Sequence, residues 1–312
     1  MSFWLDKKVL ITGGNGFLGK HLVPRIKNLG AEVFTFSKQE YDLRKESDVA
    51  GLFEKFMPQI VIHLAVNGGG IGYMREHPGS IFYDNMMMNL LVVEMSRKYK
   101  VEKFVGVGTV CSYPKYTMVP FREEDLWNGY PEETNAPYGL AKKMMLVQTQ
   151  SYYQEFGFNG IHLLLVNMYG PHDNFNFSTS HVIPALIRKC VEAIKEGKDE
   201  IVVWGTGKAS REFLYVEDAA EGIVLATEKY NKPEPVNLGA GFEITIKDLV
   251  DLIVKLTGFK GKVVWDTTKP DGQPRRCLDT SKAEKEFGFK AKTTFEEGLK
   301  KTIEWYKNLV LS

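Results

Sequence analysis

The amino-acid sequence predicts an α/β fold: a doubly wound parallel sheet with a smaller C-terminal α/β lobe. From residue 8 to about residue 166, short β-branched apolar runs alternate with longer segments of helical periodicity. The runs are VLIT, EVFTF, IVIHLA, KFVGVGT and GIHLLLV. Each is apolar at nearly every position, which is typical of parallel strands that helices cover on both faces. Alternating strands and helices require crossover connections, and these build a doubly wound sheet.

After residue 167 the pattern changes. A loop rich in Gly, Pro, Asn and Asp leads to a helical segment at 181–197 and to the strand-and-turn sequence IVVWGTG. Thr245 and Thr294 are each followed three residues later by an acidic residue, as at many helix starts. The segments REFLYVED and VNLGA resemble a return to the first sheet. We therefore predict one domain of residues 1–167 plus about 211–240, and a second of residues 168–210 and 241–312.

The composition excludes several classes of protein. The 312 residues include 40 basic and 39 acidic side chains, for a net charge of +1, so nothing points to a nucleic-acid partner. The N-terminal stretch MSFWLDKKVL meets a charge at Asp6, unlike a signal peptide, and the apolar runs are too short to span a bilayer. The three cysteines show no metal-site spacing and form no even set for disulfides. We expect a cytoplasmic protein without a metal site.

The first strand is followed by a glycine-rich turn, GGNGFLG, and then by a helix. Glycines are needed where the backbone turns sharply, approaches a pyrophosphate and packs a helix on a strand. The helix N-terminus adds amide donors and the positive end of its dipole. This context predicts a dinucleotide-binding (Rossmann) domain. The expected cofactor contacts here and after the third strand are Gly13, Gly16, Phe17, Leu18, Gly19 and Ala65.

The end of the second strand bears on the choice of cofactor. An acidic residue there would hold the ribose 2′-hydroxyl and favour NAD. The sequence instead offers Ser37 and Lys38, which suit a 2′-phosphate, so we favour NADP and keep NAD as the alternative. Lys38 could equally be a solvated surface residue. Asp42, just beyond, could face the adenine amino group.

Tyr138 and Lys142 are four residues apart in NAPYGLAKK and therefore share a helix face. A nearby ammonium favours ionisation of a phenol, and the same lysine could hold the nicotinamide ribose. The strand KFVGVGT ends in the hydroxyl of Thr109. Tyr138, Lys142 and Thr109 are therefore candidate catalytic residues.

With these motifs the sequence resembles the extended short-chain dehydrogenase/reductase family over essentially its whole length. The matching segments are GGIGYMREHP, FYDNMMM, CSYPK, PEETNAPYGLAKK, NMYGPHDNF, SHVIPALIRK, VVWGTG, REFLYVED and KPDGQPRRCLD. The resemblance implies an enzyme that inverts carbons 3 and 5 of a GDP-4-keto-6-deoxyhexose and then reduces the 4-keto group with NADPH. It also implies a homodimer.

The resemblance assigns roles to Cys111 and His181. Removing a hydrogen next to a ketone is feasible if the enolate oxygen is stabilised, and inversion needs a second acid on the opposite sugar face. Cys111 and His181 are expected to form that opposed pair, while Tyr138 and Thr109 hold the oxygen. The alternative is that Cys111 is a core filler and His181 a loop histidine.

The resemblance further implies substrate contacts in the second lobe. Arg211 is the best candidate for a diphosphate oxygen, because a guanidinium can form paired hydrogen bonds with phosphate. Trp204 could instead serve packing alone, and Arg275 is a weaker pyrophosphate candidate. The full expected set is Asn167, Lys189, Trp204, Arg211 and Arg275.

Three positions depart from the family pattern. Thr109 stands where the family usually has serine, and its methyl group would crowd the sugar. Asn67 replaces a lysine, and Asn15 replaces an arginine of the glycine loop, which bears on the NADP preference.

Two other functions stay open. One is a nucleotide-sugar epimerase that inverts C4, or C3 and C5, and recycles its NAD without net reduction. The other is a non-catalytic dinucleotide-binding protein. A 4,6-dehydratase is disfavoured because Val110 and Cys111 occupy the places of its Asp-Glu pair.

Overall fold

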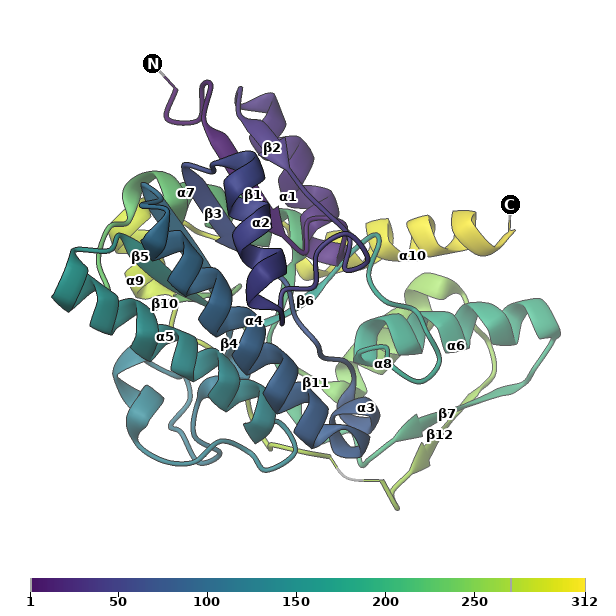
Figure 1. The fold of residues 1–312 in the computed structure, drawn as a ribbon. Helices are drawn as coiled ribbons and strands as arrows, with labels where there is room; N and C mark the ends of the chain where they lie inside the picture. Colours follow the sequence, from purple (N-terminus) through teal and green to yellow (C-terminus); the bar gives the residue numbers. More distant parts are fainter. Residues whose placement is uncertain (1, 270, 312) are drawn as a thin grey trace.

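The computed structural model describes residues 2–269 and 271–311, and its central element is one six-stranded sheet (Figure 1). The strands are β1 (Lys8–Thr12), β2 (Glu32–Phe34), β3 (Ile60–His63), β4 (Lys103–Thr109), β5 (Gly160–Leu165) and β10 (Val236–Leu238). Their order is β10-β5-β4-β3-β1-β2, and every neighbouring pair is parallel. The predicted doubly wound parallel sheet is therefore confirmed.

Helices cover both faces of this sheet. The strands alternate their side chains between the faces, so Val9 and Ile11 of β1 join one core cluster and Leu10 joins another. The first cluster lies under α1 (Phe17–Asn28) and α7 (Val216–Lys229), with α9 (Ser281–Phe287) beside α7. The second lies under α2 (Glu46–Phe56), α4 (Pro78–Lys98) and α5 (Ala136–Phe156). Coverage on both faces explains why the strands are apolar at consecutive positions.

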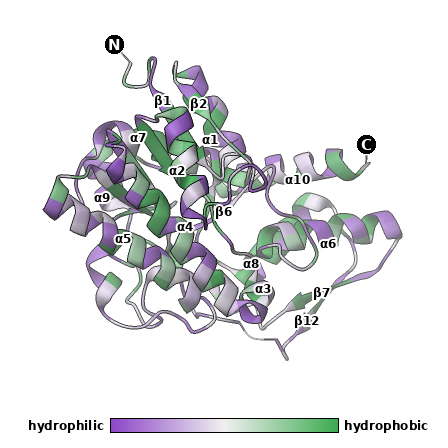
Figure 2. Cartoon of the chain, in the orientation of Figure 1, coloured by the Kyte–Doolittle hydropathy of each residue, from purple (hydrophilic) through white to green (hydrophobic). Residues whose placement is uncertain are grey.

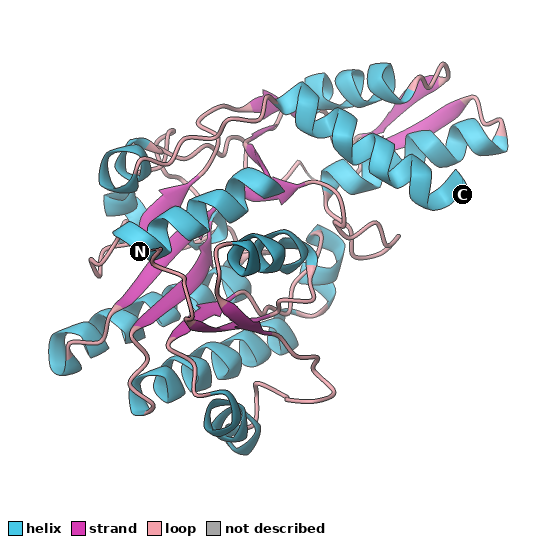
Figure 3. Cartoon of the chain, turned by 90° about the horizontal axis from the view of Figure 1, so that it is seen from above, coloured by secondary structure: helices cyan, strands magenta, loops and turns pink. Residues whose placement is uncertain are grey.

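The second lobe packs three helices around its own apolar core, and Figures 1 and 3 show this lobe beside the central sheet. Its helices are α6 (Val182–Glu196), α8 (Ile246–Thr257) and α10 (Phe295–Leu311), and its strand pair is β7 (Glu200–Trp204) with β12 (Lys262–Asp266). The Thr245 hydroxyl accepts a hydrogen bond from the Asp248 amide at 3.0 Å, which confirms the predicted start of α8. Helix α6 ends at Glu196, and Gly197 follows as its C-cap with φ +66°.

Two further strand pairs connect the lobes. They are β6 (Asn167–Tyr169) with β9 (Phe213–Tyr215), and β8 (Ser210–Arg211) with β11 (Ile244–Thr245). The segments that hold α7 and β10 pack with the central sheet, although the division into two domains stays a prediction. Figure 2 shows apolar strands inside and mixed hydropathy along the helices, as amphipathic helices require.

The carboxyl ends of the parallel strands meet at one edge of the central sheet. There β1 runs into the glycine turn and β4 runs into a 3₁₀ turn, η1 (Val110–Ser112). Ligands of open α/β sheets bind at this edge. Among the described residues, the longest and most apolar helices still fall short of what a membrane span requires.

Candidate active site

The glycine turn after β1 has no room for side chains. Gly13 has φ +68°, and a Cβ there would lie 2.9 Å from the Ala65 amide nitrogen. A Cβ on Gly19 would lie 2.3 Å from the Gly14 carbonyl oxygen, so this glycine lets α1 begin directly on the turn. The bare backbone and the N-terminus of α1, which begins at Phe17, form a cradle that fits a pyrophosphate. The residues present therefore suit a dinucleotide, as predicted.

A pocket of about 590 Å³ opens beside this turn. Four predicted cofactor residues line it: Gly13, Lys38, Asp42 and Ala65. Its volume suits the adenosine part of a dinucleotide. Residues outside the predicted set also line it, including Arg44, Asn67, Tyr73 and Asp84.

Asp42 is engaged by Arg44. The Arg44 guanidinium donates to both Asp42 oxygens, at 2.9 and 2.6 Å, and to Asp84 at 3.1 Å. These hydrogen bonds hold the pKa of Asp42 well below its usual range. Asp42 thus lines this pocket with its carboxylate already bound to Arg44, and its expected contact with the adenine amino group stays a prediction.

Ser37 is also engaged, by a residue that the sequence analysis did not single out. Its amide and hydroxyl donate to the Glu40 carboxylate at 2.7 and 2.8 Å. The Glu40 carboxylate therefore occupies both Ser37 donors, whereas Lys38 lines the pocket. Asn15, in the glycine loop, donates to the Phe36 carbonyl at 3.3 Å and so connects the loop with the end of the second strand.

Thr109, Tyr138 and Lys142 meet at the end of β4. Thr109 is the last residue of the strand, and its side chain lies beside the Tyr138 hydroxyl. Tyr138 and Lys142 lie one turn apart near the start of α5, which follows Asn135 and has Pro137 in its first turn. The structure therefore brings these three predicted residues together, and their catalytic roles stay predictions.

Burial dominates the electrostatics of this group. It raises the pKa of Tyr138 above its ordinary value, with a smaller contribution from Cys111 in the same direction and an opposing one from Thr109. Burial also lowers the pKa of Lys142 to about 7. The expected lowering of the Tyr138 pKa by Lys142 is therefore not what this geometry gives. A phenol that stays neutral is suited to donate a proton to a substrate oxygen.

The pKa of Lys142 predicts a pH-dependent stability. Between pH 7 and 10.5 the unfolded chain binds the lysine proton and the folded chain does not, so the stability contribution of this group rises with pH over that window. Lys142→Met should stabilise the protein at pH 7. It should also reduce the increase in the free energy of unfolding between pH 7 and pH 9.5 by on the order of 2–3 kcal/mol. Urea unfolding without added cofactor at both pH values measures this. Parallel pH dependences for variant and wild type would contradict it.

Gly139 sets how closely α5 approaches η1. A Cβ at this position would lie 2.2 Å from the Cys111 carbonyl oxygen, and the Ser112 hydroxyl donates to the Gly139 carbonyl at 2.9 Å. The small residue thereby fixes the backbone of Cys111 against the helix that carries Tyr138.

Gly139→Ala should destabilise the protein by about 1–3 kcal/mol, because the overpacked helix must move away from η1. Gly51→Ala in α2 is the matched control. No neighbouring atom lies within 4 Å of its added methyl group, so it should stabilise by about 0.5–1 kcal/mol. Denaturant unfolding of both variants measures the two changes in the free energy of unfolding. A Gly139→Ala variant as stable as the wild type would show that the contact between α5 and η1 is not rigid.

Cys111 lies partly exposed beside a buried cation. The Arg276 Nη1 atom lies 3.5 Å from its Sγ atom, and the Asn135 Oδ1 atom lies 3.8 Å from it. Gln273 orients this arginine by accepting from its Nε at 3.1 Å. Cys111 is thus not sealed in the core, and two polar groups face its sulfur.

The two adjacent arginines of the PRRC sequence have different surroundings. Arg275, the predicted pyrophosphate contact, is exposed and forms an ion pair with Glu243. Arg276 is buried beside Cys111 and lies close to Arg211. Burial, and after it the charge of Arg276, lowers the pKa of Arg211 to about 10. Sequence analysis missed Arg276, although the motif contained it, because adjacency along a loop does not say which side chain faces inward.

His181 precedes α6 and is exposed, but the surrounding protein still lowers its pKa. The segment before it packs on the glycine-rich loop at 68–70: the Gly70 amide donates to the Thr179 carbonyl at 2.9 Å. A Cβ on Gly70 would lie 2.4 Å from the Ser180 carbonyl oxygen. This contact joins the two lobes next to His181, whose position opposite Cys111 stays a prediction.

The remaining predicted substrate residues are spread along the chain. Asn167 begins β6, and Trp204 ends β7 with its side chain 52% exposed. The Lys189 Nζ atom donates to the Val202 carbonyl at 2.7 Å, so it ties α6 to β7. Asn67, at the position of the family lysine, is held by Asp84 and by the Tyr73 hydroxyl at 2.9 and 3.0 Å.

A glycine cradle at the first strand and a Thr-Tyr-Lys group at the end of β4 define a dinucleotide-dependent enzyme of the α/β class. The chain belongs to the NAD dependent epimerase/dehydratase family, whose model matches residues 9–239.

Individual relatives narrow the comparison. The chain is 39% identical over 315 aligned residues to "Probable GDP-L-fucose synthase 1" of Oryza sativa subsp. japonica, covering 100% of this chain and 96% of that protein. Among solved structures it is similar to a GDP-6-OMe-4-keto-L-xylo-heptose reductase from C. jejuni, with TM-score 0.94, 28% identity and coverage of 99% and 100%. A GDP-L-fucose synthetase from Naegleria fowleri bound to NADP matches with TM-score 0.90, 30% identity and coverage of 100% and 97%.

Proposed function

We propose that the protein is a nucleotide-sugar epimerase/reductase that converts a GDP-4-keto-6-deoxyhexose to GDP-L-fucose or a related deoxy sugar with NADPH. The observation that carries this proposal is the position of Cys111, partly exposed at the same sheet edge as Thr109, Tyr138 and Lys142. A carbonyl reductase needs no thiol there, whereas an epimerase needs a base beside the ketone. The names of the relatives agree with a GDP-linked sugar.

The residues that would hold the cofactor are those of the glycine cradle and its neighbouring pocket. The cradle at Gly13, Gly16 and Gly19 would hold the pyrophosphate, and the pocket with Lys38 and Ala65 the adenosine. Lys142 would hydrogen-bond the nicotinamide ribose. Bound NADPH supplies the hydride that reduces the ketone. NADP in a relative of known structure supports this choice over NAD.

Proton transfer in both steps would fall to side chains of this chain. Cys111 would take the proton from the carbon beside the ketone, and the electron pair of the broken C–H bond would form an enolate. Tyr138 and Thr109 would hold the enolate oxygen, while His181 would return a proton to the opposite face of that carbon. In the reduction, Tyr138 would donate its proton to the carbonyl oxygen.

The proposal is tested by incubating the protein with GDP-4-keto-6-deoxy-mannose and NADPH in deuterium oxide. Deuterium at C3 and C5 together with stoichiometric oxidation of NADPH is the expected result. Label without net cofactor oxidation would instead indicate an epimerase that recycles its cofactor. No reaction of either kind would contradict the proposal and favour a binding protein.

We also propose that the protein is a homodimer formed through α4 and α5. Large apolar side chains are exposed on these helices: Tyr83 is 60%, Leu90 47% and Val147 39% exposed. Gln148 donates to the Leu90 carbonyl at 3.1 Å, so these positions of the two helices are neighbours. Burying such side chains between copies would remove apolar surface from water.

The double change Leu90→Glu and Val147→Glu should convert the dimer to a folded monomer at micromolar concentration, because it places charges in the interface. Sedimentation velocity measures the assembly, and circular dichroism confirms the fold. A wild-type monomer would contradict the proposed assembly.

The protein is proposed to act in the cytoplasm, where the reduced state of its free cysteines, Cys111, Cys190 and Cys277, would be maintained.

A further inference from the structure

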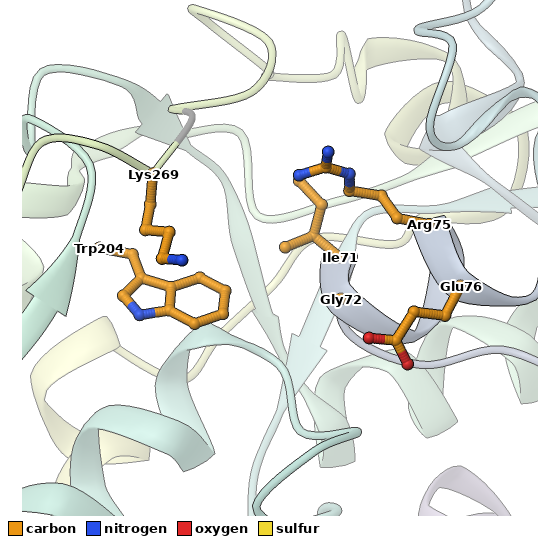
Figure 4. A pocket seen from close by; sticks show the side chains of 6 residues that line it. All are labelled: Ile71, Gly72, Arg75, Glu76, Trp204 and Lys269. Carbon is orange, nitrogen blue, oxygen red and sulfur yellow. The ribbon is translucent and has the colours of Figure 1, made fainter.

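A second pocket lies apart from the cofactor pocket, between α3 (Ile71–Glu76) and the ends of β7 and β12. Its volume is about 390 Å³. Ile71, Gly72, Arg75 and Glu76 line one side, and Trp204 and Lys269 line the other (Figure 4). We propose that this pocket holds the base of the sugar nucleotide, and that Glu76 and Arg75 make it selective for guanine. The inference rests on the proposed function and specifies how the nucleotide is recognised.

The pocket offers the surfaces that a planar base requires. Trp204 has 52% of its surface exposed, and the Lys269 Nζ atom lies 5.4 Å from the ring centroid. Ile71 is 37% exposed on the facing helix and adds an apolar wall. Bases stack on aromatic side chains with little regard to base type, so Trp204 would supply affinity rather than selectivity.

Selectivity would come from the two charged side chains of α3. Guanine presents N1–H and a 2-amino group as adjacent donors, and O6 and N7 as acceptors. A carboxylate accepts paired donors, and a guanidinium donates to O6 and N7. Glu76 and Arg75 therefore match guanine, whereas adenine lacks this donor pair and uracil has a single ring donor between two carbonyls.

These two side chains are also available to a ligand. Within residues 2–269 and 271–311, neither the Arg75 nor the Glu76 side chain forms a hydrogen bond or an ion pair. Arg44 and Arg275, by contrast, are held by carboxylates. In Figure 4 both α3 side chains extend from the helix beside the pocket.

The position of the pocket suits a nucleoside diphosphate whose sugar reaches the predicted catalytic residues at the end of β4. A Cβ on Gly272 would lie 3.4 Å from the Arg211 Nη2 atom and 4.0 Å from the Ile71 Cδ1 atom, so the pocket wall adjoins Arg211. Arg211 in turn lies close to Arg276, which contacts Cys111. A base in the pocket, a diphosphate at Arg211 and a sugar at Cys111 thus follow one continuous path.

The test measures binding of nucleoside diphosphates to the full chain by isothermal titration calorimetry. GDP should bind the wild type at least tenfold more tightly than inosine diphosphate, which lacks the 2-amino group, and more tightly again than ADP or UDP. Glu76→Gln should reduce the ratio of the affinity for GDP to the affinity for inosine diphosphate at least fivefold. Arg75→Gln should weaken both nucleotides alike, because both carry O6 and N7. Glu304→Gln, an exposed carboxylate on α10, is the matched control and should leave the ratio unchanged.

An unchanged ratio in Glu76→Gln, with both nucleotides still bound, would overturn the inference. Oxidation of NADPH with the GDP-4-keto sugar separates the two proposals. Turnover together with an unchanged ratio would leave the enzyme function standing and remove Glu76 from base recognition. No turnover together with a Glu76-dependent ratio would show a guanine site in a protein with another activity.

Discussion

Tyr138→Phe should abolish reduction, lowering the rate of NADPH oxidation by about 10³-fold or more. The reason lies at the end of β4, where the Tyr138 hydroxyl lies beside Thr109 and Tyr138 is the phenol of the predicted catalytic group. Burial keeps this phenol neutral by raising its pKa, so its proton is available for the oxygen that forms when hydride reaches C4. Phenylalanine keeps the ring and removes only that proton.

Steady-state NADPH oxidation with the GDP-4-keto sugar measures this effect, with NADP⁺ binding as the check on cofactor affinity. Tyr116→Phe is the control, because this tyrosine is 86% exposed and should leave the rate unchanged. If Tyr138→Phe kept more than a tenth of the wild-type rate, a different group would have to donate the proton.

Cys111→Ser should slow the exchange of sugar hydrogens with solvent by about 10²-fold or more, while reduction of the ketone is largely retained. Serine preserves the size of the side chain, but its hydroxyl is a far weaker acid than a thiol, so it cannot serve as the base. The sulfur contacts Arg276 at 3.5 Å and Asn135 at 3.8 Å, so polar groups surround the atom that would accept the proton.

Mass spectrometry of deuterium at C3 and C5, recorded beside NADPH oxidation, measures both activities in one reaction. Cys190→Ala is the control, since this cysteine is buried in the core of the second lobe. Equal loss of exchange and reduction in Cys111→Ser would contradict the division of labour between Cys111 and Tyr138.

The local motifs could be predicted from the sequence because each depends on residues close together in the chain. The strand of β1 and the glycine turn are adjacent, and Tyr138 and Lys142 share one helix face. The central strands were also predictable, since burial on both faces leaves an apolar run in the sequence. The second strand is shorter than the predicted run EVFTF: it spans Glu32–Phe34 at the edge of the sheet, where only β1 pairs with it.

The surroundings of individual site residues were not predictable. Glu40 takes up the Ser37 donors and Arg44 takes up Asp42, although the sequence analysis considered Ser37 and Asp42 as cofactor contacts. The sign of the Tyr138 pKa shift also differed, because burial outweighs the effect expected of Lys142. Such outcomes depend on which neighbours exclude water, and a sequence pattern does not encode that.

The sequence by itself determined the doubly wound sheet, the glycine cradle and the hydroxyl, phenol and lysine that meet at the end of β4. Only the tertiary structure decided that Arg276 rather than Arg275 faces Cys111, and that α3 closes a pocket with Trp204. The physical reason is chain separation. Periodicity and turn chemistry act over a few residues, whereas these contacts join segments more than a hundred residues apart, whose approach depends on how the two lobes pack.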